Sequence, residues 1–287
     1  MPIDIRLLTQ LPELHEAVTL QTIYWGSVVE SLVPAQMMFT IVKSGGHVIA
    51  AFDGKRMVGV LIGLLATSGT PARDHLVIYS KRMLVLPDYR GQGIAQDLKF
   101  RQLQTAREQG IGRVTWTYDP LLAVNAHFNI RKLGAISDDY VENYYGQDVD
   151  DYGLSIQGIS DRLIVQWDAN SPGVEQRLMK QFKSDELAQY LEGHKLSIIN
   201  LSQVEKDIPY PTDAIKLHKN LVVMLEIPRD FRELVNTFPE VARSWRQQTR
   251  RLFTTYLCDR HYRVIDFVTG YYEGSERAFY VLQRPDI

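Results

Sequence analysis

Cysteine is almost missing from this sequence of 287 residues, in which Cys258 stands alone. A single thiol excludes an internal disulfide and leaves too few thiolates for a structural zinc site. We therefore expect no metal centre, and we interpret Cys258 as a thiol of the hydrophobic core.

Long hydrophobic runs are also missing. The longest, from Met57 to Thr67, has about half of the roughly 20 residues that a membrane helix needs. Residues 1–10 include acidic and polar side chains where a signal peptide would have an apolar run. These two absences predict a cytoplasmic protein without a membrane partner.

An excess of one charge is the third absence. The chain has 32 Lys and Arg residues against 34 Asp and Glu residues, so its net charge is −2. This balance provides no overall attraction to nucleic acids, and we expect no nucleic-acid partner. With 45% hydrophobic and 23% charged residues, the composition is typical of a globular protein, and the length suits one large or two modest domains.

Strand-like and helix-like patterns alternate in the first 168 residues. An Asp-Gly pair at 53–54 separates two apolar segments, which is a strong signal for a hairpin. The expected order is strand 3–8, helices 11–24 and 34–42, hairpin 48–66, strand 76–86, helix 94–109, strand 113–118, helix 124–133 and strand 162–167. This order predicts a mixed α/β layer fold.

A cluster of Asn, Ser, Pro and Gly at 170–173 is the best candidate for a linker. After it we expect helix 174–192, strands near 196–201 and 221–227, a long helical stretch 230–262, and strands 263–268 and 278–283. We thus predict a first domain over residues 1–168 and a smaller C-terminal α/β domain over residues 174–287.

The segment from Val85 to Gln96 carries the clearest functional signal. A buried strand ends at Pro87, a loop with Gly91 and Gly93 follows, and a helix begins directly after it. Glycines let the backbone approach a ligand closely, and the first turn of a helix offers free N–H groups with a partial positive charge. This combination is typical of a phosphate-binding site.

Other phosphate loops fit this segment less well. A dinucleotide-binding loop has a third glycine at the position of Gln96, although Asp119 stands where its acidic residue is expected. A nucleoside-triphosphate loop has Gly-Lys-Ser/Thr, which this sequence does not contain. A plain turn between a strand and a helix is the remaining alternative.

The spacing of Val85, Arg90, Gly93 and Ala95 resembles the acyl-CoA-binding motif of the GNAT superfamily, in which the same residue types recur at the same intervals. The resemblance extends over residues 1–168, because the order of the elements is also similar. A subgroup of predicted GNAT acyltransferases contains stretches similar to residues 116–121, 125–135, 161–167, 226–228 and 244–250.

The resemblance implies an N-acyltransferase whose donor is an acyl-CoA, with acetyl-CoA as the default and succinyl-CoA or another acyl-CoA as alternatives. The acceptor that it implies is the amine of a small molecule such as an amino acid. Backbone groups of residues 84–86 would hold the pantetheine arm, and N–H groups of residues 90–95 would hold the pyrophosphate. The residues implied in binding the coenzyme are Leu84, Val85, Leu86, Arg90, Gly91, Gln92, Gly93, Ile94, Ala95 and Asn125.

The general acid is not identified by the resemblance. Many relatives place a tyrosine two residues before a Lys-x-Gly sequence, and Ile130 stands at that position here. The polar candidates nearby are Asn125, His127, Tyr140, Tyr144 and Tyr145. Each of these residue types is more often structural than catalytic, and we expect Asn125 to contact coenzyme A.

The strand before the loop offers no carboxylate as a general base. Alternation along this strand places Ser80 and Arg82 on one face and Lys81 on the other. A cation that faces the cleft would suit a carboxylate on the acceptor or on a dicarboxylic acyl group. Arg82 is therefore a candidate for substrate binding, and the alternative is an ion pair between Arg82 and a surface acid.

The C-terminal domain has a strand–helix–strand order that resembles half of the same fold, but no glycine-rich loop follows Pro228. We therefore expect a degenerate half without a second coenzyme A site, which closes the acceptor pocket or forms a homodimer. A basic and aromatic stretch in this domain is interpreted as a solvated helix face with one buried tryptophan. It consists of Arg243, Trp245, Arg246, Arg250 and Arg251.

Two other functions are compatible with these residues. A non-catalytic acyl-CoA-binding module would explain the missing tyrosine and the missing strand carboxylate. A dinucleotide-binding protein is disfavoured by Gln96.

Overall fold

The structure is a computed structural model. It describes residues 2–26, 32–69, 76–146, 155–179, 187–193, 197–212, 215 and 217–285. The chain forms two compact units, of which the first contains residues 1–116 and 167–171, and the second contains residues 117–166 and 172–287. Both units combine strands with helices, so the predicted mixed α/β fold is confirmed. The predicted domain boundaries at 168 and 174 stay a prediction.

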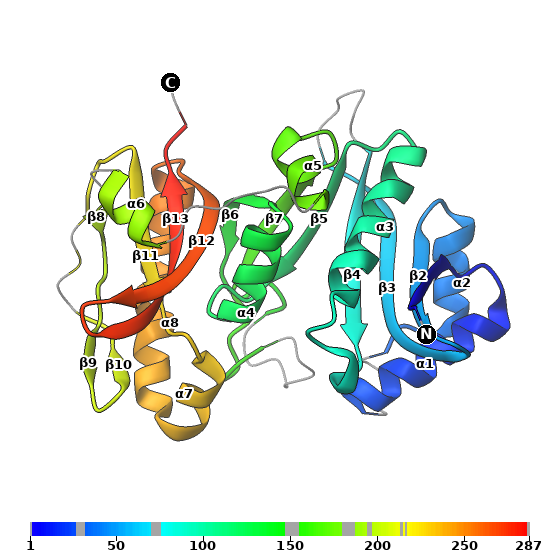
Figure 1. The fold of residues 1–287 in the computed structure, drawn as a ribbon, viewed down its shortest axis with the longest axis horizontal. Helices are drawn as coiled ribbons and strands as arrows, with labels where there is room; N and C mark the ends of the chain where they lie inside the picture. The colour runs from blue at the N-terminus through cyan, green and yellow to red at the C-terminus, as the bar shows by residue number, and fades with distance from the viewer. Residues whose placement is uncertain are drawn as a thin grey trace. The chain divides into compact units, whose positions relative to one another are not determined.

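The sheet of the first unit has the strand order β1-β2-β3-β4-β5 (Figure 1). All neighbouring strands are antiparallel except β4 and β5, which are parallel. The predicted hairpin is confirmed, with Gly54 in the left-handed conformation at φ +57°. The strands are β1 Asp4–Leu7, β2 His47–Asp53, β3 Arg56–Thr67, β4 Leu76–Val85 and β5 Arg113–Tyr118.

Helices cover both faces of this sheet. The helices are α1 Leu11–Trp25, α2 Ala35–Lys43 and α3 Ile94–Glu108. Helices α1 and α2 pack on the face that carries Val60 and Leu84, whereas α3 packs on the face that carries Leu61 and Val85. Figure 1 shows α3 lying across β3 and β4. A central strand covered on both faces explains why β3 is apolar at nearly every position.

The sheet of the second unit has the strand order β7-β6-β12-β13-β11-β8. Its strands are β6 Ile136–Val141, β7 Arg162–Asp168, β8 Ser197–Ile198, β11 Val222–Ile227, β12 Arg263–Tyr272 and β13 Ser275–Gln283. A separate hairpin joins β9 Gln203–Glu205 and β10 Ile208–Tyr210. Strand β6 and this hairpin were not predicted, because acidic and polar residues interrupt their apolar alternation.

The helices of the second unit correct several predictions. They are α4 Ala123–Ala126, which continues as a π-helix over residues 127–132, and α5 Pro172–Leu178, α6 Leu187–Gly193, α7 Phe231–Thr237 and α8 Pro239–Phe253. The predicted linker was wrong at Pro172 and Gly173, because a proline suits the first turn of a helix and α5 begins there. The predicted helix 174–192 is represented by α5 and α6, and residues 180–186 lie outside the described residues.

The long helical stretch predicted over 230–262 is broken at Phe238. This residue has φ −138° and ψ 66°, which is not helical, and it precedes Pro239. A proline ring disfavours the helical conformation of the residue before it, so α7 ends and α8 starts anew. The stretch after α8 continues as a π-helix over residues 254–259.

Helix α8 and helix α6 cover opposite faces of the strands β11, β12 and β13. The ring of Phe253 on α8 meets the ring of Tyr280 at 5.3 Å between centroids. Leu187 on α6 packs in a cluster with Phe279 and Val281 instead. Complete burial of such a side chain stabilises the fold by about 2 kcal/mol.

Two expectations about the C-terminal part were wrong. Cys258 is exposed and does not belong to the core. The basic stretch on α8 is not a solvated face throughout, because Arg246 is only 1% exposed. Arg250 is part-buried and donates from Nη2 to Asp161 Oδ1 at 2.7 Å. The predicted buried tryptophan is confirmed, since Trp245 is 0% exposed.

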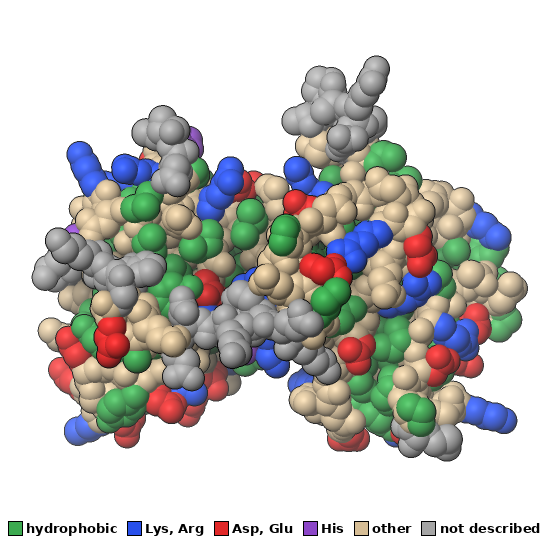
Figure 2. Space-filling model, turned by 45° about the horizontal axis from the view of Figure 1, so that its top comes forward, with side chains coloured by type: hydrophobic (Ala, Val, Ile, Leu, Met, Phe, Trp, Pro, Cys, Tyr) green, Lys and Arg blue, Asp and Glu red, His purple; other side chains and the backbone are tan. Residues whose placement is uncertain are grey.

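Basic and acidic side chains are interspersed on the face shown in Figure 2, in agreement with the net charge of −2. Among the described helices, none combines the length and the apolar character that crossing a bilayer requires.

Candidate functional site

The glycine loop connects β4 to α3 in the first unit. Leu86, the residue after β4, donates its backbone N–H to the carbonyl of Val58 at 2.9 Å. Pro87–Tyr89 then form one 3₁₀ turn. Gly91 and Gly93 then adopt left-handed conformations, with φ of +76° and +88°. The loop backbone is exposed from Arg90 to Gly93.

The loop presents a row of free backbone donors. In the described part of the chain, the N–H groups of residues 91–95 donate to no other protein group, whereas those of Gln96 and Asp97 donate to the carbonyl of Gly93. Gly93 is the N-cap of a 15-residue helix and has no side-chain cap. Free N–H groups at the positive end of a helix attract an anion, so this geometry is compatible with the predicted phosphate site, which stays a prediction.

The two glycines are required by conformation and not by lack of space. A Cβ atom at Gly91 or Gly93 would meet no heavy atom within 4 Å. A side chain would nevertheless be strained at either position, because positive φ brings Cβ close to the backbone carbonyl. The ligand-facing surface thus stays formed by main-chain atoms.

The side chains of Tyr89 and Arg90 hold the loop against the rest of the first unit. Tyr89 donates its hydroxyl to Asp53 Oδ2 at 2.9 Å. Arg90 donates from Nε to the carbonyl of Val85 at 3.4 Å, and its guanidinium lies 5.3 Å from the ring centroid of Tyr24. The predicted coenzyme-binding residues of this segment, 84–86 and 90–95, are therefore brought together in one unit.

Strands β4 and β5 stay paired over a short distance only. Their parallel pairing consists of Ile78↔Val114 and Tyr79↔Thr115 among the described residues, although β4 continues to Val85. The edge of β4 that follows Tyr79 therefore lacks a β5 partner. Such an edge can bind an extended ligand through main-chain hydrogen bonds, as an added strand would.

A bulge in β4 overturns the predicted facing of its polar residues. Gly63 pairs with Ser80 and Ile62 pairs with Arg82, so Lys81 is an extra residue. Ser80 contacts α3, whereas the Arg82 guanidinium lies 4.4 Å from the ring centroid of Trp25 on α1. The two side chains are on opposite faces because one inserted residue reverses the alternation.

Beneath this bulge lies a chain of buried polar groups that the sequence analysis missed. Lys99 Nζ on α3 lies 2.8 Å from Ser80 Oγ and donates to Gln102 Oε1 at 3.2 Å. Gln102 Nε2 lies 3.0 Å from His47 Nε2, and His47 Nδ1 has no hydrogen-bond partner in the described structure. The available signal was the position of Lys99 four residues before Leu103, within the buried stripe of α3.

Burial shifts the pKa values of both basic groups in this chain. Desolvation lowers the pKa of Lys99 well below its ordinary value. Burial also lowers the pKa of His47 to about 4, and the charges of Lys99 and Arg101 act in the same direction. His47 is therefore neutral at pH 7, and burial disfavours the ammonium form of Lys99.

The five candidates for the general acid belong to the second unit. Tyr140 donates its hydroxyl to Asp161 Oδ2 at 2.6 Å, and burial followed by the charge of Asp161 raises the pKa of Tyr140. Tyr144 stacks edge-on against Tyr145 with centroids 4.9 Å apart. Their catalytic roles stay predictions, and the contacts of Tyr140 suit a structural one.

His127 and Asn125 lie at the start of the π-helix and in α4, and both are half-buried. Desolvation, and then Lys132 and Arg131, lower the pKa of His127. Ile130, at the position of the tyrosine of many relatives, is fully buried. The expected contact between Asn125 and coenzyme A stays a prediction.

Asp119, the acid that a dinucleotide site would use, is engaged elsewhere. Its two carboxylate oxygens accept from Arg246 at 2.8 and 2.6 Å, and Oδ1 also accepts from the N–H of Leu121. A ribose would have to compete with a buried ion pair. Among the described residues, no group of three or more His, Cys, Asp or Glu is arranged to hold a metal ion.

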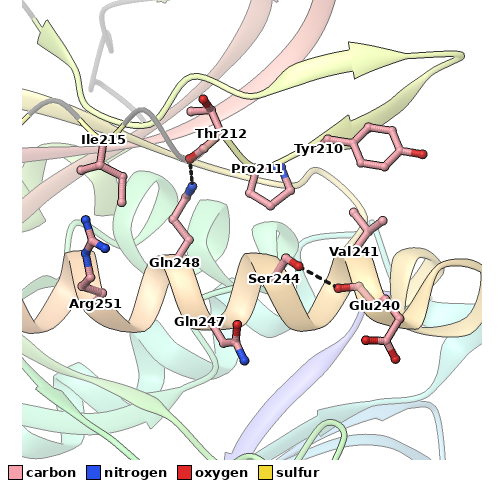
Figure 3. A pocket seen from close by; sticks show the side chains of 10 residues that line it. All are labelled: Tyr210, Pro211, Thr212, Ile215, Glu240, Val241, Ser244, Gln247, Gln248 and Arg251. Atoms are coloured by element: carbon pink, nitrogen blue, oxygen red, sulfur yellow. Dashed lines mark hydrogen bonds between the residues drawn. The ribbon is translucent and has the colours of Figure 1, made fainter.

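A separate cavity of about 580 Å³ lies within the second unit, between α8 and the segment that follows β10 (Figure 3). Gln248 Nε2 donates to the carbonyl of Thr212 at 2.6 Å on its wall. Of the arginines singled out in the sequence, Arg251 lines it. None of residues 82–95 belongs to this cavity.

Comparison with known proteins identifies the segment that contains the glycine loop. Residues 14–134 match the model of the acetyltransferase (GNAT) family. No curated protein sequence matches the chain. The match includes the glycine loop, the β4 bulge and the buried chain of polar groups.

Solved structures are similar to parts of the chain. An N-acetyltransferase from Staphylococcus aureus Mu50 is 14% identical, with a TM-score of 0.46 over 59% of this chain and 100% of that one. The protein smu.2055 from Streptococcus mutans UA159 is 18% identical, with a TM-score of 0.45 over 58% and 99%. The ribosomal-protein-S18-alanine N-acetyltransferase from Escherichia coli is 15% identical, with a TM-score of 0.44 over 60% and 97%.

Proposed function

We propose that the protein is an acyl-CoA-dependent N-acyltransferase, because residues 14–134 match the model of the acetyltransferase (GNAT) family. The single observation that carries the proposal is the row of free N–H groups at residues 91–95, placed at the start of α3 directly after β4. The donor is acetyl-CoA by default, with succinyl-CoA or another acyl-CoA as the alternative. The acceptor is the amine of a small molecule such as an amino acid.

The loop residues fit the pyrophosphate of coenzyme A. Its oxygens need several donors at close range and no bulky side chain, and residues 91–95 supply main-chain N–H groups without another partner in the described structure, with glycine at two positions. The edge of β4 at residues 84–86 would hold the pantetheine arm by main-chain hydrogen bonds. Coenzyme A would supply the activated acyl group as a thioester.

The role of the protein in the reaction is to orient and to stabilise. The amine attacks the thioester carbon, the N–C bond forms, the C–S bond breaks, and coenzyme A leaves as a thiol. Holding both reactants in one geometry lowers the barrier, because a reaction between two molecules becomes effectively intramolecular. Backbone N–H groups of β4 would stabilise the negative charge that develops on the carbonyl oxygen.

Arg82 is proposed to recognise a carboxylate on the acceptor or on the acyl group. Its guanidinium lies over the ring of Trp25, which holds a planar cation in place by stacking. We expect Arg82→Ala to change the preference among acyl-CoAs or amines that carry a carboxylate. Kinetics that stay unchanged with acetyl-CoA, succinyl-CoA and amino acids would exclude this role.

The coenzyme site is tested by calorimetric titration with coenzyme A. We expect the protein to bind it, and we expect Gly93→Val to weaken binding at least tenfold, since a branched side chain strains the left-handed conformation and covers the N–H groups. Gly110→Val is the matched control at the other end of α3, where φ is +72° and a Cβ would also meet nothing within 4 Å. A wild-type protein that gives no heat with coenzyme A contradicts the assignment.

Catalysis is tested by incubating the protein with acetyl-CoA or succinyl-CoA, a thiol reagent and a panel of amines. An enzyme releases free coenzyme A only when a suitable amine is added. The second candidate is a non-catalytic binding module, because the buried Ile130 stands where many relatives have a tyrosine. Such a module would bind acyl-CoA and would release no free coenzyme A.

A further inference from the structure

Lys99 is a buried lysine that lacks a carboxylate partner. Lys99 is only 2% exposed, and in the described part of the chain it forms no ion pair with Asp or Glu. Its hydrogen-bonding neighbours are the neutral groups of Ser80 and Gln102. An unpaired ammonium in such surroundings is strongly disfavoured, so burial favours the neutral amine, which keeps a lone pair.

The surroundings of Lys99 nevertheless suit a brief positive charge. Nζ lies 3.5 Å from the centroid of the Trp116 ring, whose π face attracts a cation. The side-chain oxygen of Gln102 accepts from the same nitrogen at 3.2 Å. A group that is neutral at rest, yet has partners for its charged form, is suited to accept a proton.

Ser80 connects this amine to the open part of the strand. It is the residue directly before the bulge at Lys81, and β4 loses its pairing to β5 after Tyr79. Ser80 is 8% exposed, whereas Lys99 is 2% exposed and lies within hydrogen-bond distance of it. A hydroxyl can accept one proton and donate another, so it can transmit a proton to a group that the substrate does not reach.

Gly63 on the neighbouring strand β3 leaves room for the chain of His47, Gln102 and Lys99. Ser80 pairs with Gly63, and a Cβ at Gly63 would stand 2.3 Å from His47 Nε2 and 2.8 Å from Gln102 Nε2. Contacts that short do not occur, so any side chain at position 63 would displace the polar chain. The glycine keeps Gln102 in position between His47 and Lys99.

We propose that Ser80 and Lys99 form the proton relay of acyl transfer, an inference that rests on the function proposed above. As the amine nitrogen bonds to the thioester carbon, Ser80 accepts the amine proton and donates its own to Lys99 Nζ. The C–S bond then breaks, and the proton returns through Ser80 to the thiolate sulfur. One proton moves from nitrogen to sulfur, so the step balances without the tyrosine that Ile130 replaces.

The first test uses Ser80→Ala, Ser80→Thr and Lys99→Met in the full chain. The substrates are acetyl-CoA and the amine that the panel shows to react fastest. We expect Ser80→Ala and Lys99→Met to lower kcat about 10²- to 10⁴-fold, the usual contribution of general acid–base catalysis. Ser80→Thr keeps the hydroxyl and should stay within about tenfold of the wild type. Lys43→Met, an exposed lysine on α2, is the matched control and should leave kcat unchanged.

The pH profile separates a relay from a merely structural lysine. In the wild type, the rate should rise with pH as Lys99 loses its proton, and Lys99→Met should remove that limb. Calorimetry should show unchanged affinity of these variants for coenzyme A. Retention of both kcat and the rising limb by Lys99→Met would overturn the relay, while leaving the proposed function intact.

A second measurement does not depend on turnover. Lysines labelled with ¹³C at Cε are observed by NMR during a pH titration, and the signal missing from Lys99→Met identifies Lys99. A neutral amine at pH 7 is expected, and an ammonium at that pH overturns the relay. Mass spectrometry of protein quenched during turnover adds a further check, because an acyl group attached to Ser80 would make it a nucleophile instead of a relay.

Discussion

Lys99 and Arg246 are both almost completely buried, one in each compact unit, but only Arg246 faces a carboxylate. Arg246 donates to both oxygens of Asp119, and although burial alone would lower the pKa of Arg246, the Asp119 charge raises it. Lys99 has Ser80, Gln102 and the Trp116 ring instead, and desolvation lowers its pKa.

The difference between the two residues shows what burial does to a cation. A guanidinium with a bidentate acid stays charged and ties two distant parts of the sequence together. An amine without an acid loses its proton and becomes a base. The first arrangement is structural and the second is suited to chemistry, which is the pattern expected when a perturbed group lies beside an open strand edge.

The largest effect on stability is expected from removing the carboxylate that pairs with Arg246. Asp119→Ala leaves Arg246 buried with an uncompensated charge, and we expect the free energy of unfolding to fall by about 3–5 kcal/mol. Urea denaturation followed by fluorescence measures the change. Glu240→Ala is the control on α8, the helix of Arg246. It removes an exposed ion pair with Arg243 and should cost about 0.5 kcal/mol or less. Equal losses in the two variants would show that burial of Arg246 does not matter.

The second prediction concerns His47, which shares the polar chain of Lys99. Its folded pKa of about 4 lies below the ordinary 6.5, so the unfolded chain binds more protons between these pH values. The free energy of unfolding should therefore fall by about 3 kcal/mol as the pH is lowered from 6.5 to 4. His47→Gln should remove this loss, whereas His15→Gln, on an exposed face of α1, should keep it. A wild-type protein equally stable at both pH values would contradict the neutral state of His47.

The third prediction concerns the lysine itself, and the expected change in stability on substitution is opposite in sign to that of Asp119→Ala. The folded pKa of Lys99 is depressed below 10.5, so the unfolded chain binds one proton more between the two values. The free energy of unfolding of the wild type should rise with pH in this window by about 1.4 kcal/mol per pH unit. Lys99→Met should lack this slope and should be more stable than the wild type at pH 7.

Loss of activity together with a gain in stability in Lys99→Met would distinguish the two buried cations most sharply. A residue kept in spite of a stability penalty has a functional reason to be there. If Lys99→Met were instead less stable at pH 7, the lysine would be a structural member of the core, like Arg246.

Local features of the molecule could be predicted because they depend on neighbouring residues. The Asp-Gly hairpin, the ends of α3 and the left-handed Gly91 and Gly93 follow from glycine positions and short-range periodicity. The facing of Ser80 and Arg82 could not, because the bulge at Lys81 is created by pairing with β3. Breaks such as the one at Phe238 were predictable from Pro239 and were overlooked.

The glycine loop and most of the strands and helices follow from the sequence alone, since backbone conformation and apolar periodicity are local properties. Only the tertiary structure decided which charged side chains are buried and what lies beside them. Lys99 and Arg246 look alike in the sequence, as basic residues within amphipathic helices. One becomes a base and the other an anchor, because folding brings a serine to the first and an aspartate, 127 positions away, to the second.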